Sequence, residues 1–165
     1  MDNKLSKVEI LQVLSLIVLA LVTRLLPHPP NFAPITSIAL FSGVHFTNKR
    51  FAILLPIICM LVTDFYIGFH SLLPVVYFSF LIISILGIYA KKIGFLTVGL
   101  SSSIFFIVTN FGVWLVGYPH TIEGFIMCYY LAIPFFINAL LGDFFYSFIF
   151  SFSLQKIKQK RLGYS

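Results

Sequence analysis

Polar and ionisable side chains are scarce in this sequence, since only 10% of its 165 residues are charged. Arg24, Asp64 and Asn110 nevertheless lie inside long apolar segments. An ionisable group at the centre of a bilayer costs about 2.5–3.5 kcal/mol on insertion scales, so each such residue is a candidate for a functional site. A guanidinium binds anionic groups, and carboxylate and amide side chains hydrogen-bond other polar groups. Together these residue types predict the binding of a small polar or anionic solute.

Further polar side chains fall near connections that we expect on the outer side of a membrane. His28 and Asn31 follow Arg24, and His120 follows Asn110. Trp114 lies four residues after Asn110, hence on the same helical face, where its ring could stack on a solute. The candidate substrate-binding residues are therefore Arg24, His28, Asn31, Asp64, Asn110, Trp114 and His120.

Each of these candidates also has a purely structural interpretation. Arg24 and Asp64 can form an ion pair between two helices, and Arg24 can instead extend its charge to the outer headgroups. Trp114 can be an interfacial aromatic residue, because tryptophan and tyrosine are enriched at membrane surfaces. Asn110 can bond between helices, a contact worth about 0.6–2 kcal/mol. The sequence leaves these alternatives open.

Three histidines are expected on the same side of the membrane as the candidate site. His28, His70 and His120, with Asp64 and Glu123, could ligate a transition metal. They come from different connections and show no local ligand spacing. We therefore favour hydrogen bonding at the interface for them, and we expect no metal site and no cofactor.

Asp143 lies toward the inner half of the last apolar segment. We expect it to pair with a polar group on another helix or with the basic inner connections. A proton-relay role is the alternative, since carboxylates inside membrane segments often serve proton transfer.

The composition determines the class of protein that must position these side chains. Hydrophobic residues make up 59% of the chain, and the mean hydropathy is +1.02. Ordinary globular chains are about 25% charged, and apolar runs near the ~20 residues that cross a bilayer recur here. We predict one all-α membrane domain over residues 1–165, a compact bundle of six transmembrane helices. The predicted helices cover residues 8–26, 34–46, 51–68, 73–90, 95–116 and 124–154.

A proline-rich bend between residues 24 and 34 is the feature around which we expect the bundle to be organised. It contains four of the eight prolines, and proline favours non-helical backbone here. The helix after the bend is too short to cross the membrane alone, and its N-terminus favours an anion. On that helix, Ala39 and Gly43 form a small-residue step suited to internal packing or to docking on a partner.

The basic residues predict the orientation in the membrane. With six spans, ten of the eleven lysines and arginines fall on one side, and only Arg24 lies toward the other. The positive-inside rule then places both termini in the cytoplasm. The basic residues occur as short clusters between spans, which does not indicate nucleic-acid binding.

No catalytic motif of soluble enzymes is present: there is no phosphate loop, no G-x-S-x-G elbow and no H-E-x-x-H. We therefore do not expect an enzyme. With five acidic residues in the whole chain, we expect no ATP-hydrolysing site either. Active transport would need an external motor or an ion gradient.

Two stretches carry a resemblance to a known family: residues 24–36 (RLLPHPPNFAPIT) and residues 109–115 (TNFGVWL), the latter followed by Tyr118-Pro119. Together with Gly142-Asp143, they resemble an uncharacterised family of small bacterial inner-membrane proteins. The layout is also distantly similar to the substrate-binding S components of energy-coupling-factor (ECF) transporters. That resemblance implies capture of vitamins or metal ions from the outer side, and association with a transmembrane coupling subunit and two ATPases. S components commonly dock through an alanine-rich motif on the first helix, which here offers only Ser15 and Ala20.

We therefore predict an S-component-like binding subunit for uptake of a small polar or anionic, vitamin-like solute. We place it in the bacterial cytoplasmic membrane, with the site on the extracytoplasmic side. The alternative is a non-transporting accessory subunit that packs against a larger membrane complex through its phenylalanine-rich faces.

Overall fold

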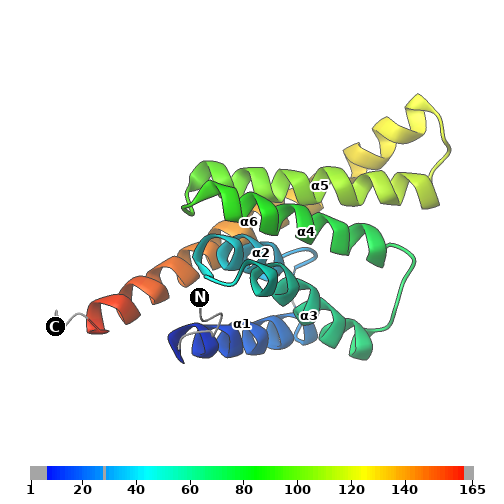
Figure 1. The fold of residues 1–165 in the computed structure, drawn as a ribbon. Helices are drawn as coiled ribbons and strands as arrows, with labels where there is room; N and C mark the ends of the chain where they lie inside the picture. Colours follow the sequence, from blue (N-terminus) through cyan, green and yellow to red (C-terminus); the bar gives the residue numbers. More distant parts are fainter. Residues whose placement is uncertain (1–6, 28, 162–165) are drawn as a thin grey trace.

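A computed structural model describes residues 7–27 and 29–161, and its regular structure in that part is entirely helical. Six helices follow one another: α1 (Lys7–Leu25), α2 (Ile35–His45), α3 (Lys49–Ile67), α4 (Leu73–Ala90), α5 (Phe95–Gly117) and α6 (Ile122–Arg161). The all-α class and the six predicted helices are confirmed. Figure 1 shows how these helices are arranged.

Except at the end of α6, the helix boundaries lie within two residues of the predicted ones, and two of the differences have a local reason. α3 begins at Lys49 because Asn48 caps it, its side-chain oxygen accepting a hydrogen bond from the Phe51 N–H at 3.2 Å. Lys49 and Arg50 thus belong to the first turn of α3 and not to the connection. α6 continues to Arg161 and is 40 residues long. Lysine, glutamine and arginine are good helix formers, so the basic tail extends the helix.

Four helices in the described part are long and apolar enough to cross a membrane: α3, α4, α5 and residues Ile122–Lys156 of α6. Large apolar side chains such as Phe95 (83% exposed) and Phe65 (76%) stand on the outside, as lipid contact requires. The chain is therefore a multi-pass helical membrane protein. Four of the six predicted spans thus correspond to helices that could cross a membrane, and the count of six stays a prediction.

α2 is a short helix enclosed by the rest of the bundle. Its 11 residues cover about 16 Å, against a hydrocarbon core of ~30 Å. Residues 35–43 are all buried, and α3, α4, α5 and α6 all pack against it. The neighbouring helices thus shield α2, and its backbone is kept from lipid.

The small residues of α2 face α4. A Cβ placed on Gly43 would lie 2.4 Å from the Ser84 backbone oxygen and 3.0 Å from the Gly87 Cα. Ala39 is fully buried as well. Of the two roles that the sequence left open for Ala39 and Gly43, the structure shows internal packing, because both residues are buried within the chain and Gly43 lets two of its helices approach closely.

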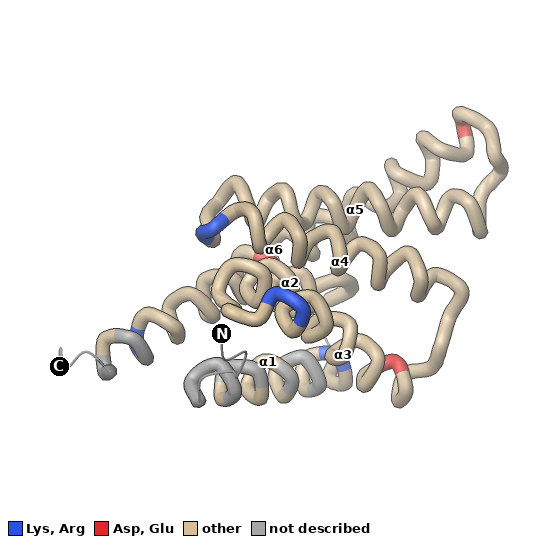
Figure 2. Tube along the Cα trace, viewed as in Figure 1, with Lys and Arg blue, Asp and Glu red and all other residues tan. Residues whose placement is uncertain are grey.

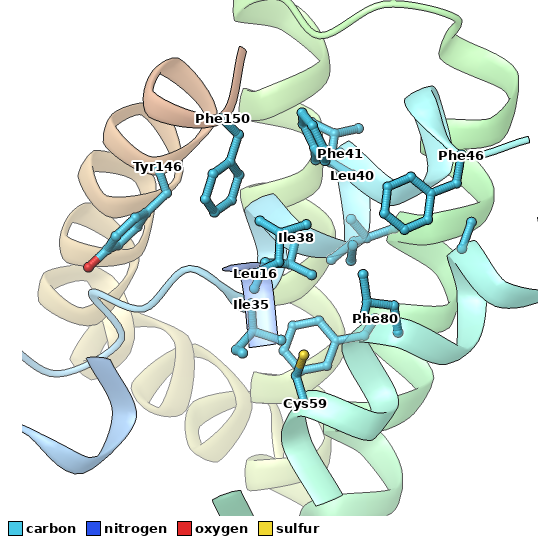
Figure 3. Close-up of a cluster of buried hydrophobic side chains, with 14 of the residues drawn as sticks. Leu16, Ile35, Ile38, Leu40, Phe41, Phe46, Cys59, Phe80, Tyr146 and Phe150 are labelled. Atoms are coloured by element: carbon cyan, nitrogen blue, oxygen red, sulfur yellow. The ribbon is translucent and has the colours of Figure 1, made fainter. Parts of the chain in front are cut away.

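The core lies around α2 and contains side chains from all six helices. Figure 3 shows Phe41 and Ile38 of α2 among Leu16 of α1, Cys59 of α3 and Phe80 of α4. Tyr146 and Phe150 of α6 close the cluster on another side. This packing holds α2 in place, so that its N-terminus has a defined position.

The connections alternate between the two ends of the bundle. The α3–α4 and α5–α6 connections lie at the right end in Figure 1, and the α4–α5 connection lies at the left end. In Figure 2 the α4–α5 connection is basic, whereas an acidic residue marks the α5–α6 end. The cytoplasmic position of the basic end stays a prediction.

Candidate functional site

An ion pair joins the end of α1 to the end of α3. Arg24 Nη2 lies 2.8 Å from Asp64 Oδ1, and the Asp64 side chain is 1% exposed. The Tyr77 hydroxyl on α4 donates to Asp64 Oδ2 at 2.7 Å, and Arg24 Nη1 contacts the Met60 sulfur. Both carboxylate oxygens thus have a donor, which a buried charge requires. The guanidinium of Arg24 on α1 is thus held by Asp64 and Met60, both on α3, and Tyr77 of α4 in turn holds the Asp64 carboxylate.

Arg24 is 16% exposed, and it lines a cavity of about 270 Å³ that we call the Arg24 cavity. Its polar lining comes from Arg24, Asn31, Thr36 and His70. Apolar side chains complete it, namely Ala33, Ile35, Met60, Val76, Phe80, Phe105 and Ala139. The cavity therefore combines a few polar groups with a mostly hydrophobic wall, as small-molecule sites do.

The N-terminus of α2 forms part of this wall through Ile35 and Thr36. The first helical hydrogen bond runs from the Ile38 N–H to the Pro34 oxygen at 2.8 Å. Pro34 offers no side-chain cap, so no cap satisfies the first N–H groups of the helix. These groups carry a partial positive charge, which adds to that of Arg24.

A second hollow of about 310 Å³ adjoins the first, and we call it the Asn110 cavity. Asn31, Val76 and Phe105 line both cavities. The second one also has Thr109, Asn110 and Tyr118 in its wall. The Asn110 amide nitrogen donates to the Phe106 backbone oxygen at 2.8 Å, which leaves the amide oxygen for another partner.

The structure brings Arg24, Asn31 and Asn110 of the predicted site to these two adjoining cavities. Asn31 is central to both, and its positive φ of 64° turns the backbone of the bend at this point. Asp64 lines neither cavity and instead holds Arg24 from behind. In this structure Asp64 positions Arg24, and its contact with a solute stays a prediction. His28 lies outside the described residues.

Trp114 and His120 line neither cavity. The Trp114 indole N–H donates to the Pro119 oxygen at 3.1 Å, and its ring lies 5.3 Å from the His120 ring. His120 Nε2 lies 3.0 Å from the Leu115 oxygen. These bonds close the turn between α5 and α6. The structure therefore brings neither Trp114 nor His120 to the two cavities, and their contact with a solute stays a prediction.

Tyr77, His70 and Thr36 join the site without having been among the predicted residues. Tyr77 carries a hydroxyl inside a largely apolar helix, and this polar group could have marked it as a candidate in the sequence. Its distance along the chain from Asp64 gave no indication of contact, because the two lie on different helices.

Among the residues that the structure describes, no group of three or more His, Cys, Asp or Glu side chains could hold a metal ion. His70 borders the Arg24 cavity, whereas His120 belongs to the α5–α6 turn. These two histidines are therefore not brought together.

Residues 4–162 match a family described as a family of unknown function, DUF6580. The chain belongs to this family. No curated protein and no solved structure matches it. The predicted membership of an uncharacterised family is thus confirmed, and the likeness to S components is not found in these comparisons. The DUF6580 match covers both cavities and the Arg24–Asp64 pair.

Proposed function

We propose that the protein is a membrane substrate-binding protein that captures a small polar or anionic solute, in the manner of an ECF S component, for uptake. The observation that carries the proposal is Arg24, which Asp64 and Met60 of α3 hold at the wall of a hollow inside a membrane bundle. An arginine that only tied two helices together would need no such hollow beside it.

The charges of the site favour a solute with a single acidic or strongly polar group. The Arg24–Asp64 pair has no net charge, although a guanidinium has five N–H donors and Asp64 receives one of its bonds here. The α2 N-terminus adds roughly half a positive charge. That combination suits one carboxylate or a polar head, and it offers little to a multiply charged anion.

The two cavities together suit an amphiphilic molecule. Arg24, Asn31 and Thr36 would bind the polar end. The body of the molecule would then lie along Val76 and Phe105, toward Asn110. A vitamin-like solute has this character, with one polar end and a flat or aliphatic remainder.

The proposal also includes location and partners. By the positive-inside rule the site opens on the extracytoplasmic side of a bacterial cytoplasmic membrane, with both termini inside. An ECF-type coupling subunit with ATPases is the partner that we propose, and it would have to dock on faces other than Ala39 and Gly43. The rival function is an accessory subunit of a larger membrane complex, for which the cavities would have no use.

Native mass spectrometry of the protein purified in mild detergent tests the proposal. We expect a retained small molecule, and we expect the released compound to raise the melting temperature when it is added back. Asn31→Gly removes a side chain that lines both cavities while keeping the backbone conformation, since glycine accepts a positive φ. This variant should lose the retained molecule.

The matched control is His120→Ala, which changes a predicted residue outside both cavities and should keep the molecule. Retention by Asn31→Gly, or copurification with a respiratory or secretion complex and no bound solute, would contradict the proposed function.

A further inference from the structure

Asp143 on α6 is a second buried carboxylate, and it takes no part in the Arg24–Asp64 ion pair. The residue is 2% exposed. Ser102 of α5 donates to Asp143 Oδ2 at 2.6 Å, and the Ser37 hydroxyl of α2 lies 3.4 Å from Oδ1. Ser147, one turn further along α6, donates to the Ser37 hydroxyl at 3.2 Å. The predicted pairing with a polar group on another helix is confirmed.

No basic side chain in the described part of the chain forms an ion pair with Asp143. A buried carboxylate without a cation is costly, because the apolar surroundings disfavour its charge. The hydroxyls provide hydrogen bonds but no positive charge. The predicted alternative, pairing with the basic inner connections, is therefore not what the described residues show.

The hydroxyls that surround Asp143 can serve it in two protonation states, since a hydroxyl both donates and accepts. With an ionised carboxylate, Ser102 donates to Oδ2. With a proton on Oδ2, the acid donates to the Ser102 oxygen, and the Ser102 hydrogen turns to the Val98 backbone oxygen at 3.2 Å. Ser37 has a similar second acceptor, the Asp143 backbone oxygen at 3.0 Å. Neither state leaves these groups unbonded.

The same three helices that surround Asp143 also line the Arg24 cavity. Thr36 directly precedes Ser37, and Ala139 lies about one turn before Asp143 on α6. Phe105 lies about one turn after Ser102 on α5. On each helix that holds the carboxylate, a residue of the cavity wall therefore lies within about one helical turn of the bonded residue.

We propose that Asp143, with Ser37 and Ser102, forms a proton-binding site inside the membrane bundle. A proton enters without needing space, forms an O–H bond at the carboxylate and leaves again from the same oxygen. A sodium ion would have to break the direct 2.6 Å hydrogen bond between Ser102 and Asp143. This site would couple a proton gradient to the capture of the solute, a step that rests on the proposed function.

Other titratable groups on the helices around Asp143 are few. α5 has no acidic, basic or histidine residue, and on α2 the histidine His45 lies about two turns beyond Ser37. On α6 they are Glu123, Cys128, Tyr129, Tyr130 and Tyr146, and the basic residues Lys156, Lys158, Lys160 and Arg161 at its far end. Arg24, which lines the Arg24 cavity, is paired with Asp64. A titrating carboxylic acid can therefore be assigned by substitution.

Infrared difference spectroscopy of the full chain in phosphatidylcholine liposomes, stepped between acid and alkaline pH in potassium buffer, tests the site. We expect the C=O band of a protonated carboxylic acid to appear at acid pH and to be lost in Asp143→Asn. Ser102→Ala keeps the acid but removes its closest hydrogen bond, so the band should shift in frequency. Glu123→Gln, on an exposed acid of the same helix, is the matched control and should keep the Asp143 band.

If Asp143→Asn does not fold, the shift in Ser102→Ala decides the assignment. The proposal is overturned if no band responds to either substitution, or if replacing potassium by sodium removes the band at constant pH. The titration needs no solute, so the two proposals are tested independently. The infrared band of Asp143 can be absent while Asn31→Gly still loses its bound molecule, and the band can be present while Asn31→Gly keeps it.

Discussion

Arg24 Nη2 lies 2.8 Å from Asp64 Oδ1, and this contact links α1 to α3 across 40 positions of the chain. Because the Asp64 side chain is 1% exposed, its charge depends on the guanidinium and on the Tyr77 hydroxyl. The pair therefore serves two purposes, since it stabilises the bundle and fixes the direction in which Arg24 meets the cavity.

Arg24→Ala should destabilise the protein by about 3–5 kcal/mol, because it leaves a buried carboxylate without its cation. Thermal unfolding in detergent measures the loss. Arg24→Ala combined with Asp64→Asn should recover part of it, since the unpaired charge is then gone. The control is Arg50→Ala, at an exposed position. Equal melting temperatures for wild type and Arg24→Ala would show that the ion pair contributes nothing.

Tyr77→Phe should cost about 1.5–3 kcal/mol, the typical value of a hydrogen bond to a charged group. The ring and its packing remain, so the loss reports the bond to Asp64 Oδ2. Tyr89→Phe on the same helix removes a hydroxyl that is on the outside, where the residue is 78% exposed, and should change the melting temperature little. A Tyr77→Phe protein as stable as wild type would argue against this bond.

Gly43→Ala should destabilise the contact between α2 and α4. The added Cβ would lie 2.4 Å from the Ser84 backbone oxygen, so the helices must separate, at a cost of about 1–3 kcal/mol. Gly99→Ala is the matched control, because a Cβ there meets nothing within 4 Å. That substitution should be neutral or stabilising, since alanine favours helix over glycine by about 1 kcal/mol. Gly43→Ala should thus lower the melting temperature and Gly99→Ala should not, and a Gly43→Ala protein as stable as wild type would contradict the close approach.

Ser84→Ala should stabilise the protein by about 1 kcal/mol. The Ser84 hydroxyl is buried and has no hydrogen-bond partner among the described residues, so its desolvation is not offset. Ser79→Ala on the same helix should have the opposite effect, because that hydroxyl donates to the Val76 oxygen at 2.6 Å. Calorimetry of both variants in the same detergent checks the sign, and destabilisation by Ser84→Ala would mean that its hydroxyl has a partner.

The helices and the membrane class could be read from the sequence because both depend on local properties. Long apolar runs separated by charged, proline or glycine residues mark helix ends to within a few residues, as α4 (Leu73–Ala90) shows. The scarcity of polar groups likewise pointed to Arg24, Asn31 and Asn110, which do line adjoining cavities.

The partners of those residues required the packed bundle. In a soluble helix the apolar face reveals which side is buried, but these helices are apolar on nearly every side because lipid and core are equally hydrophobic. Hydropathy therefore could not show that Gly43 faces α4, that Trp114 closes a turn, or that Ser37 and Ser102 meet at Asp143. Contacts between distant helices depend on how their side chains fit together, and no spacing along the chain encodes that fit directly.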